Sequence, residues 1–176
     1  YEDYRLNVHG DYSNKAGRPY SIWNFYYTIV SNVNYIIASE NTMGGDPELK
    51  NSVVGQAYAM RAFAYYYLIQ LYQQTYKGHE DAPGVPLYTG ATVAGSEGVY
   101  TQINSDIEKA IDLLGSISNK VQTHISHIDY YVANGIKARI CLTQHDYAGA
   151  ATAAAEALKK PSLKVATIAE LGGNNS

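Results

Sequence analysis

Cysteine, phenylalanine and charged side chains are scarce in this sequence. Cys141 is the only cysteine, which excludes an internal disulfide and any metal site built from several thiolates. Lys, Arg, Asp and Glu together make up 16% of the residues and leave a net charge of −3. The chain therefore lacks a basic surface of the kind that binds nucleic acid or an anionic membrane, and we expect neither as a direct partner.

The motifs of common catalytic and nucleotide-binding sites are also missing. The sequence contains no P-loop, no G-x-G-x-x-G, no G-x-S-x-G and no H-E-x-x-H. Its acidic residues occur mostly on expected helix surfaces and in turns, and none forms the facing carboxylate pair that glycoside hydrolysis requires. We therefore expect a protein that is not an enzyme and that uses no cofactor.

Two histidine-containing clusters in the sequence offer potential metal ligands. His124 and His127 lie three residues apart near an expected helix start, without an evident fourth ligand. The loop sequence His79-Glu80-Asp81 offers two carboxylates to a hard cation, without the spaced ligands of a calcium loop. Solvated loop residues account for both clusters, so we expect no metal site.

Tyrosine, by contrast, is abundant, with 18 residues against 2 Phe and 1 Trp. A tyrosine ring carries a polar tip, which suits both half-wet helix packing and recognition surfaces. We expect most of these tyrosines to pack helices together and the loop tyrosines to be available for binding.

The segment from Asn51 to Tyr76 predicts the central helix of the domain. Arg61 is its only charged residue, and a guanidinium buried without a partner is costly. We therefore expect a structural Arg61, held by a carboxylate or by carbonyls at a helix end. Apolar residues spaced three or four positions apart predict a stripe that faces the core. Tyrosines spaced seven positions apart predict a second stripe on another face. The first stripe is Val53, Ala57, Met60, Ala64, Leu68 and Leu71, and the second is Tyr58, Tyr65 and Tyr72.

The stretch 19–39 carries no charge, so its length alone would suit a membrane span. Asn24, Asn32 and Asn34 argue against that interpretation, because amides are expensive in lipid. Helical spacing predicts instead a buried helix of a bundle, with a stripe of Ile22, Tyr26, Ile29, Val33 and Ile36.

Capping residues and periodicity give the range of the central helix and predict three further helices. Asp46 and Pro47 supply an N-cap and a first helical residue, and Pro161 stops the last helix. Asp106 belongs to the expected solvated face of the helix after the central one. The predicted ranges are 47–74, 99–114, a helix opened by a capping box at Ser126-x-x-Asp129, and 147–160.

Small and large residues alternate along the last helical pair in the manner of a tetratricopeptide repeat (TPR). The pattern is Ala138-x3-Leu142-x4-Tyr147-x3-Ala151-x6-Leu158-x2-Pro161. Because the period is irregular, we predict TPR-like packing and not a regular array. The predicted fold class is all-α: a TPR-like right-handed stack of about five helices with long connecting loops, forming a single domain over residues 1–176.

Four sequence blocks in this order resemble the SusD/RagB family. The most specific is Gly55-x-Ala57-x3-Arg61-Ala62-Phe63-x-Tyr65-Tyr66-x-Leu68, followed by Gly84-Val85-Pro86-Leu87. The others are Trp23-x2-Tyr26-x2-Ile29-x4-Asn34-x-Ile36, the run from Ile107 to Leu114, and Ala138-Arg139-x2-Leu142-x3-Asp146-Tyr147-x2-Ala150. Together they cover roughly Trp23 to Leu158.

The resemblance implies a glycan-binding lipoprotein of the Bacteroidetes outer membrane. Such a protein captures oligosaccharide or polysaccharide at the extracellular face for a SusC-like TonB-dependent transporter. It further implies that the chain is the helical N-terminal portion of a longer protein, whose lipidated N-terminus and C-terminal portion are absent here. Membrane contact would then run only through that lipid anchor. Two alternatives stay open: a TPR-type adaptor that binds peptides, and a glycoside hydrolase.

The best candidates for sugar contacts lie in the stretch 7–20. Tyr12 and Tyr20 offer aromatic faces, and Asn14 and Arg18 offer planar donors and acceptors, on a loop made open by glycines. The same residues would also suit a loop packed against another part of the protein. Trp23 could stack on a sugar, but its place on the first helix favours core packing.

Overall fold

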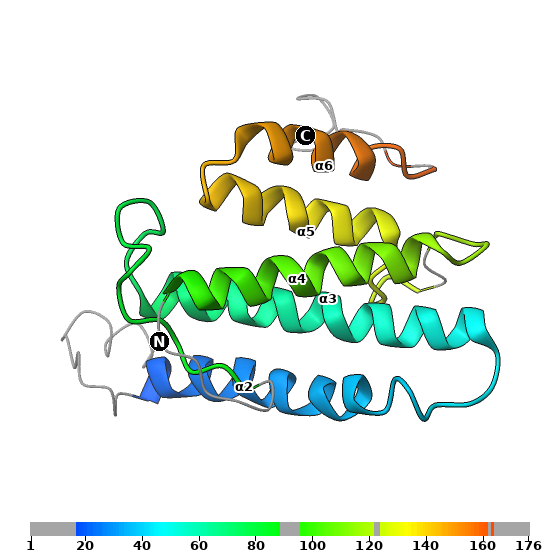
Figure 1. Cartoon of the computed structure of the whole chain (residues 1–176), viewed down its shortest axis with the longest axis horizontal. Helices are drawn as coiled ribbons and strands as arrows, with labels where there is room; N and C mark the ends of the chain where they lie inside the picture. The colour runs from blue at the N-terminus through cyan, green and yellow to red at the C-terminus, as the bar shows by residue number, and fades with distance from the viewer. Residues whose placement is uncertain (1–16, 89–95, 122–123, 162, 164–176) are drawn as a thin grey trace, which may run out of the picture.

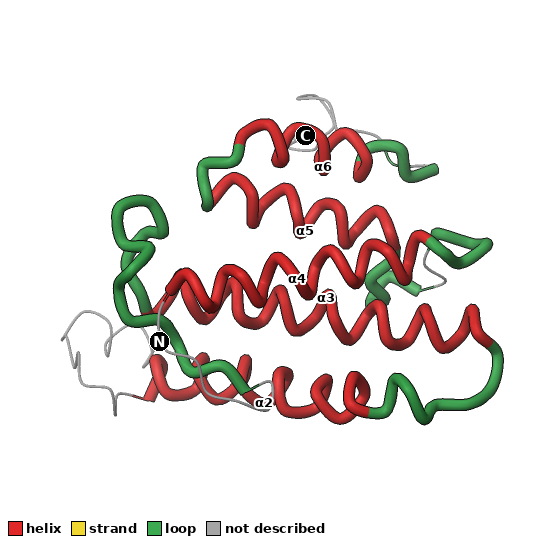
Figure 2. Tube along the Cα trace, in the orientation of Figure 1, coloured by secondary structure: helices red, strands yellow, loops and turns green. Residues whose placement is uncertain are grey.

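The computed structural model describes residues 17–88, 96–121, 124–161 and 163. Over these residues the chain forms helices and loops without a strand (Figure 2). The helices are α2 (Gly17–Ala38), α3 (Pro47–Tyr72), α4 (Ser96–Gly115), α5 (Tyr130–Thr143) and α6 (Tyr147–Ala157). The all-α prediction is confirmed.

Helices that follow one another in the chain also lie next to one another in space. Helix α2 packs on α3, α3 on α4, α4 on α5 and α5 on α6. Figure 1 shows α3 and α4 in the middle of the molecule, with α2 on one side and the α5–α6 pair on the other. Successive helices run in opposite directions, which agrees with the predicted TPR-like stack.

Three aspartates determine where helices begin. The carboxylate of Asp46 accepts a hydrogen bond from the backbone N–H of Glu48 at 3.0 Å, and Pro47 occupies the first helical position of α3. Asp146 caps α6 in the same way. Asp129 caps α5 through the N–H of Val132 at 2.8 Å. The predicted capping box at Ser126 is therefore wrong: Asp129 is itself the cap, and Ile128 precedes the helix.

The α5–α6 turn is a Schellman motif closed by a histidine. The N–H of His145 donates to the carbonyl of Leu142 at 3.1 Å, and that of Asp146 to the carbonyl of Cys141 at 2.9 Å. His145 has a φ of 62°, in the left-handed region. Because α6 starts immediately after this turn, the two helices pack closely as an antiparallel pair.

The core is built around α3, but not along the predicted apolar stripe. Val53, Met60 and Leu71 are exposed, whereas Ala57, Ala64 and Leu68 are buried. Buried residues lie on several sides of α3 and not along one stripe. The full set is Val54, Gly55, Ala57, Ala59, Arg61, Ala62, Ala64, Tyr65, Tyr66, Leu68 and Ile69. The reason is that α2 and α4 cover α3 from two sides, so small residues are needed on both contact faces.

Helix α2 lies at the edge of the bundle and is not the buried helix that its apolar spacing predicted. Val30 and Val33 are buried, but Tyr20, Phe25 and Tyr35 are exposed. Its main packing partner among the described elements is α3. Consequently one face of α2 is both exposed and free of charge. No helix in the described part of the chain combines the length and apolar character needed to cross a membrane.

Candidate functional site: an aromatic groove beside a buried ion pair

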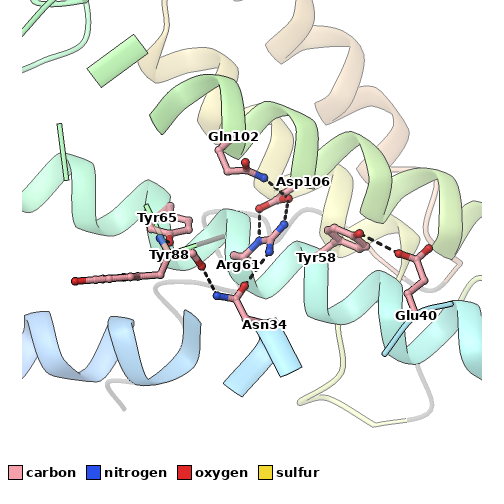
Figure 3. Close-up of polar contacts among 8 residues, drawn as sticks. All are labelled: Asn34, Glu40, Tyr58, Arg61, Tyr65, Tyr88, Gln102 and Asp106. Atoms are coloured by element: carbon pink, nitrogen blue, oxygen red, sulfur yellow. Dashed lines mark hydrogen bonds and ion pairs between the residues drawn. The ribbon is translucent and has the colours of Figure 1, made fainter. Parts of the chain in front are cut away.

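Arg61 on α3 and Asp106 on α4 form a buried ion pair. The guanidinium donates from Nε to Oδ2 at 2.7 Å and from Nη2 to Oδ1 at 2.6 Å. Arg61 is 6% and Asp106 is 1% exposed. Gln102 adds a third donor to the carboxylate at 2.8 Å (Figure 3). Arg61 thus has the carboxylate partner expected for it, whereas the assignment of Asp106 to a solvated face is wrong.

Asn34 of α2 connects this ion pair to the surface. Its Oδ1 accepts a hydrogen bond from Nη1 of Arg61 at 2.8 Å, and its Nδ2 donates to the carbonyl oxygen of Tyr88. The amide therefore faces the ion pair with one end and the segment 84–88 with the other (Figure 3). Two helices, α2 and α3, and one irregular segment therefore meet at this side chain.

Tyrosine hydroxyls hold the irregular segment 84–88 in place. The N–H of Tyr88 donates to the hydroxyl of Tyr65 at 2.7 Å, and the hydroxyl of Tyr27 donates to the carbonyl of Pro86 at 2.7 Å. Burial raises the pKa of Tyr65 to about 12, and burial also raises the pKa of Tyr27, so both hydroxyls stay neutral at pH 7. The Tyr88 N–H and the Pro86 carbonyl are thereby satisfied without a helix or a strand.

A second polar branch leads from Arg61 to the far end of α2. The Arg61 guanidinium lies 5.4 Å from the centroid of the Tyr58 ring, and the Tyr58 hydroxyl donates to Glu40 at 3.0 Å. Lys109 of α4 pairs with the same carboxylate at 3.5 Å. Figure 3 shows Tyr58 and Glu40 on the opposite side of Arg61 from Tyr88. These contacts make the network a structural tie between α2, α3 and α4.

A groove of about 520 Å³ lies where α2 meets the segment 84–88. Tyr27, Tyr35 and Tyr88 contribute aromatic rings to it, and Ser31 and Asn34 contribute polar groups. Tyr35 is 77% and Tyr88 is 54% exposed. Tyr27 meets Tyr88 edge to face, with ring centroids 5.3 Å apart. The arrangement combines accessible aromatic faces with polar groups in one concave surface.

The predicted sugar-contact residues are only partly described by the structure. Tyr12 and Asn14 lie outside the described residues. Arg18 belongs to α2, but its side chain lies outside the described part of the molecule. Tyr20 was expected in a loop and is instead on the first turns of α2, where it is exposed. This difference arises because α2 begins at Gly17, two residues before Pro19.

Trp23 packs against the core and does not stand free as a stacking platform. Its indole lies 4.7 Å from the Tyr27 ring and 5.0 Å from the Tyr72 ring, the latter edge to face. The hydroxyl of Tyr72 in turn donates to the carbonyl of Pro19. Trp23 therefore supports Tyr27, which lines the groove, from the side.

Sequence reasoning did not single out Tyr27, Tyr35 or Tyr88 as candidate site residues. Tyr35 was a position on a helix expected to be buried, and Tyr88 comes directly after the block Gly84-Val85-Pro86-Leu87, to which no ligand role was given. The sequence feature that could have identified Tyr35 is the absence of charged residues around it. This feature indicates a binding surface only if α2 is known to lie at the edge of the bundle, which the sequence does not show.

A second groove, of about 650 Å³, lies among α3, α5 and α6. Phe63, Tyr131 and Ile136 give it a largely apolar lining, with Arg139 and Lys160 also contributing. The Nζ of Lys160 pairs with Asp129 at 2.9 Å, and a guanidinium N–H of Arg139 donates to the hydroxyl of Tyr67 at 2.8 Å. Both cations are therefore engaged by the protein itself.

The two histidines His124 and His127 are not joined by further potential metal ligands in the described part of the chain. The rings of His124 and His127 lie 5.7 Å apart, and Nδ1 of His124 is 2.7 Å from the Ser126 hydroxyl. Among the described residues, no three His, Cys, Asp or Glu side chains gather as a metal site would require.

Residues 2–142 match the profile of a SusD-like family described as starch-binding and associating with the outer membrane. No curated protein sequence matches the chain significantly.

Solved structures of this superfamily are similar to the chain in fold. A SusD-like carbohydrate-binding protein from Bacteroides vulgatus is 27% identical, with a TM-score of 0.73 over 82% of this chain and 32% of its own. A SusD superfamily protein from Bacteroides fragilis is 25% identical, with a TM-score of 0.67 over 81% and 35%. One from Bacteroides thetaiotaomicron, 23% identical, has a TM-score of 0.68 over 78% and 31%. The chain thus spans about a third of the length of these structures.

Proposed function

This chain belongs to the SusD-like family of starch-binding proteins that associate with the outer membrane, and on that basis we propose that it captures glycan for nutrient uptake. The observation that carries the proposal is the family match over residues 2–142, supported by the carbohydrate-binding relative from Bacteroides vulgatus. The protein acts at the extracellular face of the outer membrane. It delivers oligosaccharide to a SusC-like TonB-dependent transporter. The longer protein to which this chain belongs is held to the membrane by a lipid anchor.

The proposed role is binding without catalysis. Glycan recognition needs aromatic faces for the apolar side of a sugar and polar groups for its hydroxyls. Tyr12, Asn14, Arg18 and Tyr20 remain our proposed contacts near the start of α2, while Trp23 serves mainly as support for the neighbouring rings. The helical stack provides the rigid scaffold on which such contacts are placed.

Calorimetric titration with maltoheptaose, laminarihexaose and xylohexaose tests the binding proposal. We expect saturable binding of at least one of these glycans. Mass spectrometry after prolonged incubation should show the same glycan uncleaved. Sustained release of shorter sugars would establish a glycoside hydrolase instead, and a lack of binding to all three would overturn the glycan role.

The transporter partnership requires a separate experiment. Chemical crosslinking in intact cells that naturally produce the protein should capture a TonB-dependent transporter, and protease added outside those cells should degrade the protein. Recovery of the protein from the cytoplasm, uncrosslinked to any outer-membrane protein, would contradict the proposed location.

A TPR-type adaptor is the second candidate function. The apolar groove lined by Phe63, Tyr131 and Ile136 favours it, because such grooves accept apolar peptide side chains. Substituting Tyr131→Ala separates the two functions. An adaptor would lose its peptide partner, whereas the glycan-binding protein should keep its affinity for the glycan found above.

A further inference from the structure

We propose that the groove between α2 and the segment 84–88 is a binding subsite for an uncharged saccharide, with Tyr35 and Tyr88 as its stacking surfaces. This inference rests on the proposed glycan-binding function and gives it a location distinct from the stretch 12–20. Both rings are accessible, and they reach the groove from different parts of the chain.

The chemistry of α2 favours a neutral ligand rich in hydroxyl groups. From Pro19 to Ser39 the helix and its end carry no charged side chain. An exposed helix face normally carries charges, which keep it solvated. The exposed residues here are instead aromatic, neutral and polar, or small: Tyr20, Ser21, Asn24, Phe25, Thr28, Ser31, Asn32, Tyr35 and Ala38. A saccharide can cover such a surface without desolvating an ionised group, which would be costly.

The wall formed by Tyr88 is fixed before any ligand arrives. The Tyr88 N–H is held by Tyr65 at 2.7 Å, and its carbonyl by Asn34. The Tyr88 ring points away from the ion pair, so the buried network fixes the backbone and leaves the ring accessible (Figure 3). A pre-positioned aromatic wall costs little ordering entropy on binding.

Asn34 is a positioning residue in this arrangement. Its oxygen accepts from Arg61 at 2.8 Å and its nitrogen donates to Tyr88, so both ends of the amide serve the protein. Hydrogen bonds to sugar hydroxyls fall instead to Ser31 and to the tyrosine hydroxyls at the rim. The groove volume of about 520 Å³ is within the range of about 300–1,000 Å³ typical of small-ligand sites.

Tyr35→Ala and Tyr88→Ala test the proposal, with Tyr147→Ala as the matched control. Tyr147 is an exposed tyrosine on α6, away from the groove. The probes are maltoheptaose, laminarihexaose and xylohexaose, titrated calorimetrically. Each groove variant should bind its glycan about tenfold more weakly, the factor that corresponds to about 1.4 kcal/mol. Tyr147→Ala should bind like the wild type, and the melting temperature should be unchanged in all three.

The variant Tyr35→Trp tests whether the ligand stacks on the side chain at position 35. An indole presents a larger stacking face, so this variant should bind at least as tightly as the wild type. Loss of binding in Tyr35→Trp equal to that in Tyr35→Ala would overturn stacking as the mode of recognition.

The outcomes separate this inference from the function on which it rests. Wild-type affinity in both alanine variants, with glycan still bound, places the sugar site elsewhere and leaves the proposed function intact. Failure of the wild type to bind any probe removes both. Sedimentation that shows a wild-type dimer, dissociated by Tyr35→Ala, would identify the groove as a contact between copies and overturn the saccharide proposal.

Discussion

The Arg61 guanidinium meets the Asp106 carboxylate through two parallel hydrogen bonds, at 2.7 Å from Nε and 2.6 Å from Nη2. Both side chains are buried, so neither charge is stabilised by bulk water. Arg61 also donates hydrogen bonds to both Asp106 and Asn34 and so connects these two side chains. The pair therefore fixes where α4 and α2 sit on α3, and it fixes through Asn34 the position of Tyr88.

Replacing Arg61 with methionine should destabilise the fold severely. Asp106 would be left as an uncompensated buried carboxylate, at a cost of about 3–5 kcal/mol. Urea unfolding followed by circular dichroism measures this loss. The double variant Arg61→Met/Asp106→Leu removes both charges and should recover most of it.

An exposed ion pair provides the control for Arg61. Lys159 pairs with Glu156 on the surface, where water and salt screen both charges, so Lys159→Met should change stability far less than Arg61→Met. A melting temperature of Arg61→Met within a degree of the wild type would show that Arg61 is not structural.

The Tyr65 hydroxyl should govern the mobility of Tyr88. Tyr65→Phe removes the hydroxyl that accepts the hydrogen bond of the Tyr88 N–H while it keeps the buried ring. We expect a loss of about 1 kcal/mol and faster hydrogen exchange at the Tyr88 amide, measured by NMR. Tyr100→Phe, which alters another buried ring, should leave that amide unchanged. Equal exchange rates in wild type and Tyr65→Phe would mean that other contacts hold the segment.

Local signals in the sequence were sufficient to place the starts of α3 and α6. Asp46-Pro47 and Asp146 determine helix starts through bonds to residues two or three positions away, so the sequence contains the whole interaction. The orientation of α3 could not be predicted in the same way. A helix that is apolar on several sides fits several stripes. Which side meets α4 depends on the close approach of Gly55 to Leu114, residues distant in sequence.

The candidate site shows the same limit. The isolated charge of Arg61 predicted a buried partner, but nothing in the sequence distinguished Asp106 from the other acids of α4. Tyr35 and Tyr88 come together only because Asn34 joins α2 to the segment 84–88. Such a site depends on tertiary contacts between segments more than fifty residues apart, which helical periodicity does not report.

Stability should fall at alkaline pH as buried tyrosines ionise. Burial raises the pKa of Tyr65 and that of Tyr100 to about 12, from 10.0. The folded state keeps these protons while the unfolded state loses them. The stabilisation is therefore complete below pH 10 and is lost as pH rises through about 12. Urea midpoints measured from pH 8 to 12 should decline above pH 10.

Tyr100→Phe is the matched variant for the alkaline decline. It removes one of the phenols whose pKa burial raises, so its urea midpoint should fall less steeply above pH 10 than that of the wild type. Identical slopes for the two proteins would show that the Tyr100 phenol does not titrate differently in the folded and unfolded states.

Two helical glycines should respond in opposite directions to the same substitution. A Cβ at Gly55 would lie 2.8 Å from Cγ of Leu114 and 3.2 Å from Cβ of Leu113, so Gly55→Ala must push α4 away from α3. Overpacking of this kind costs about 1–3 kcal/mol and outweighs the gain of up to about 1 kcal/mol from the higher helix propensity of alanine.

At Gly135 the nearest atom is Cβ of Ala157 at 4.0 Å, an ordinary contact. Gly135→Ala should therefore stabilise the protein by up to about 1 kcal/mol. Thermal melting of both variants is the measurement, and a Gly55→Ala protein more stable than the wild type would show that the α3–α4 contact can adjust.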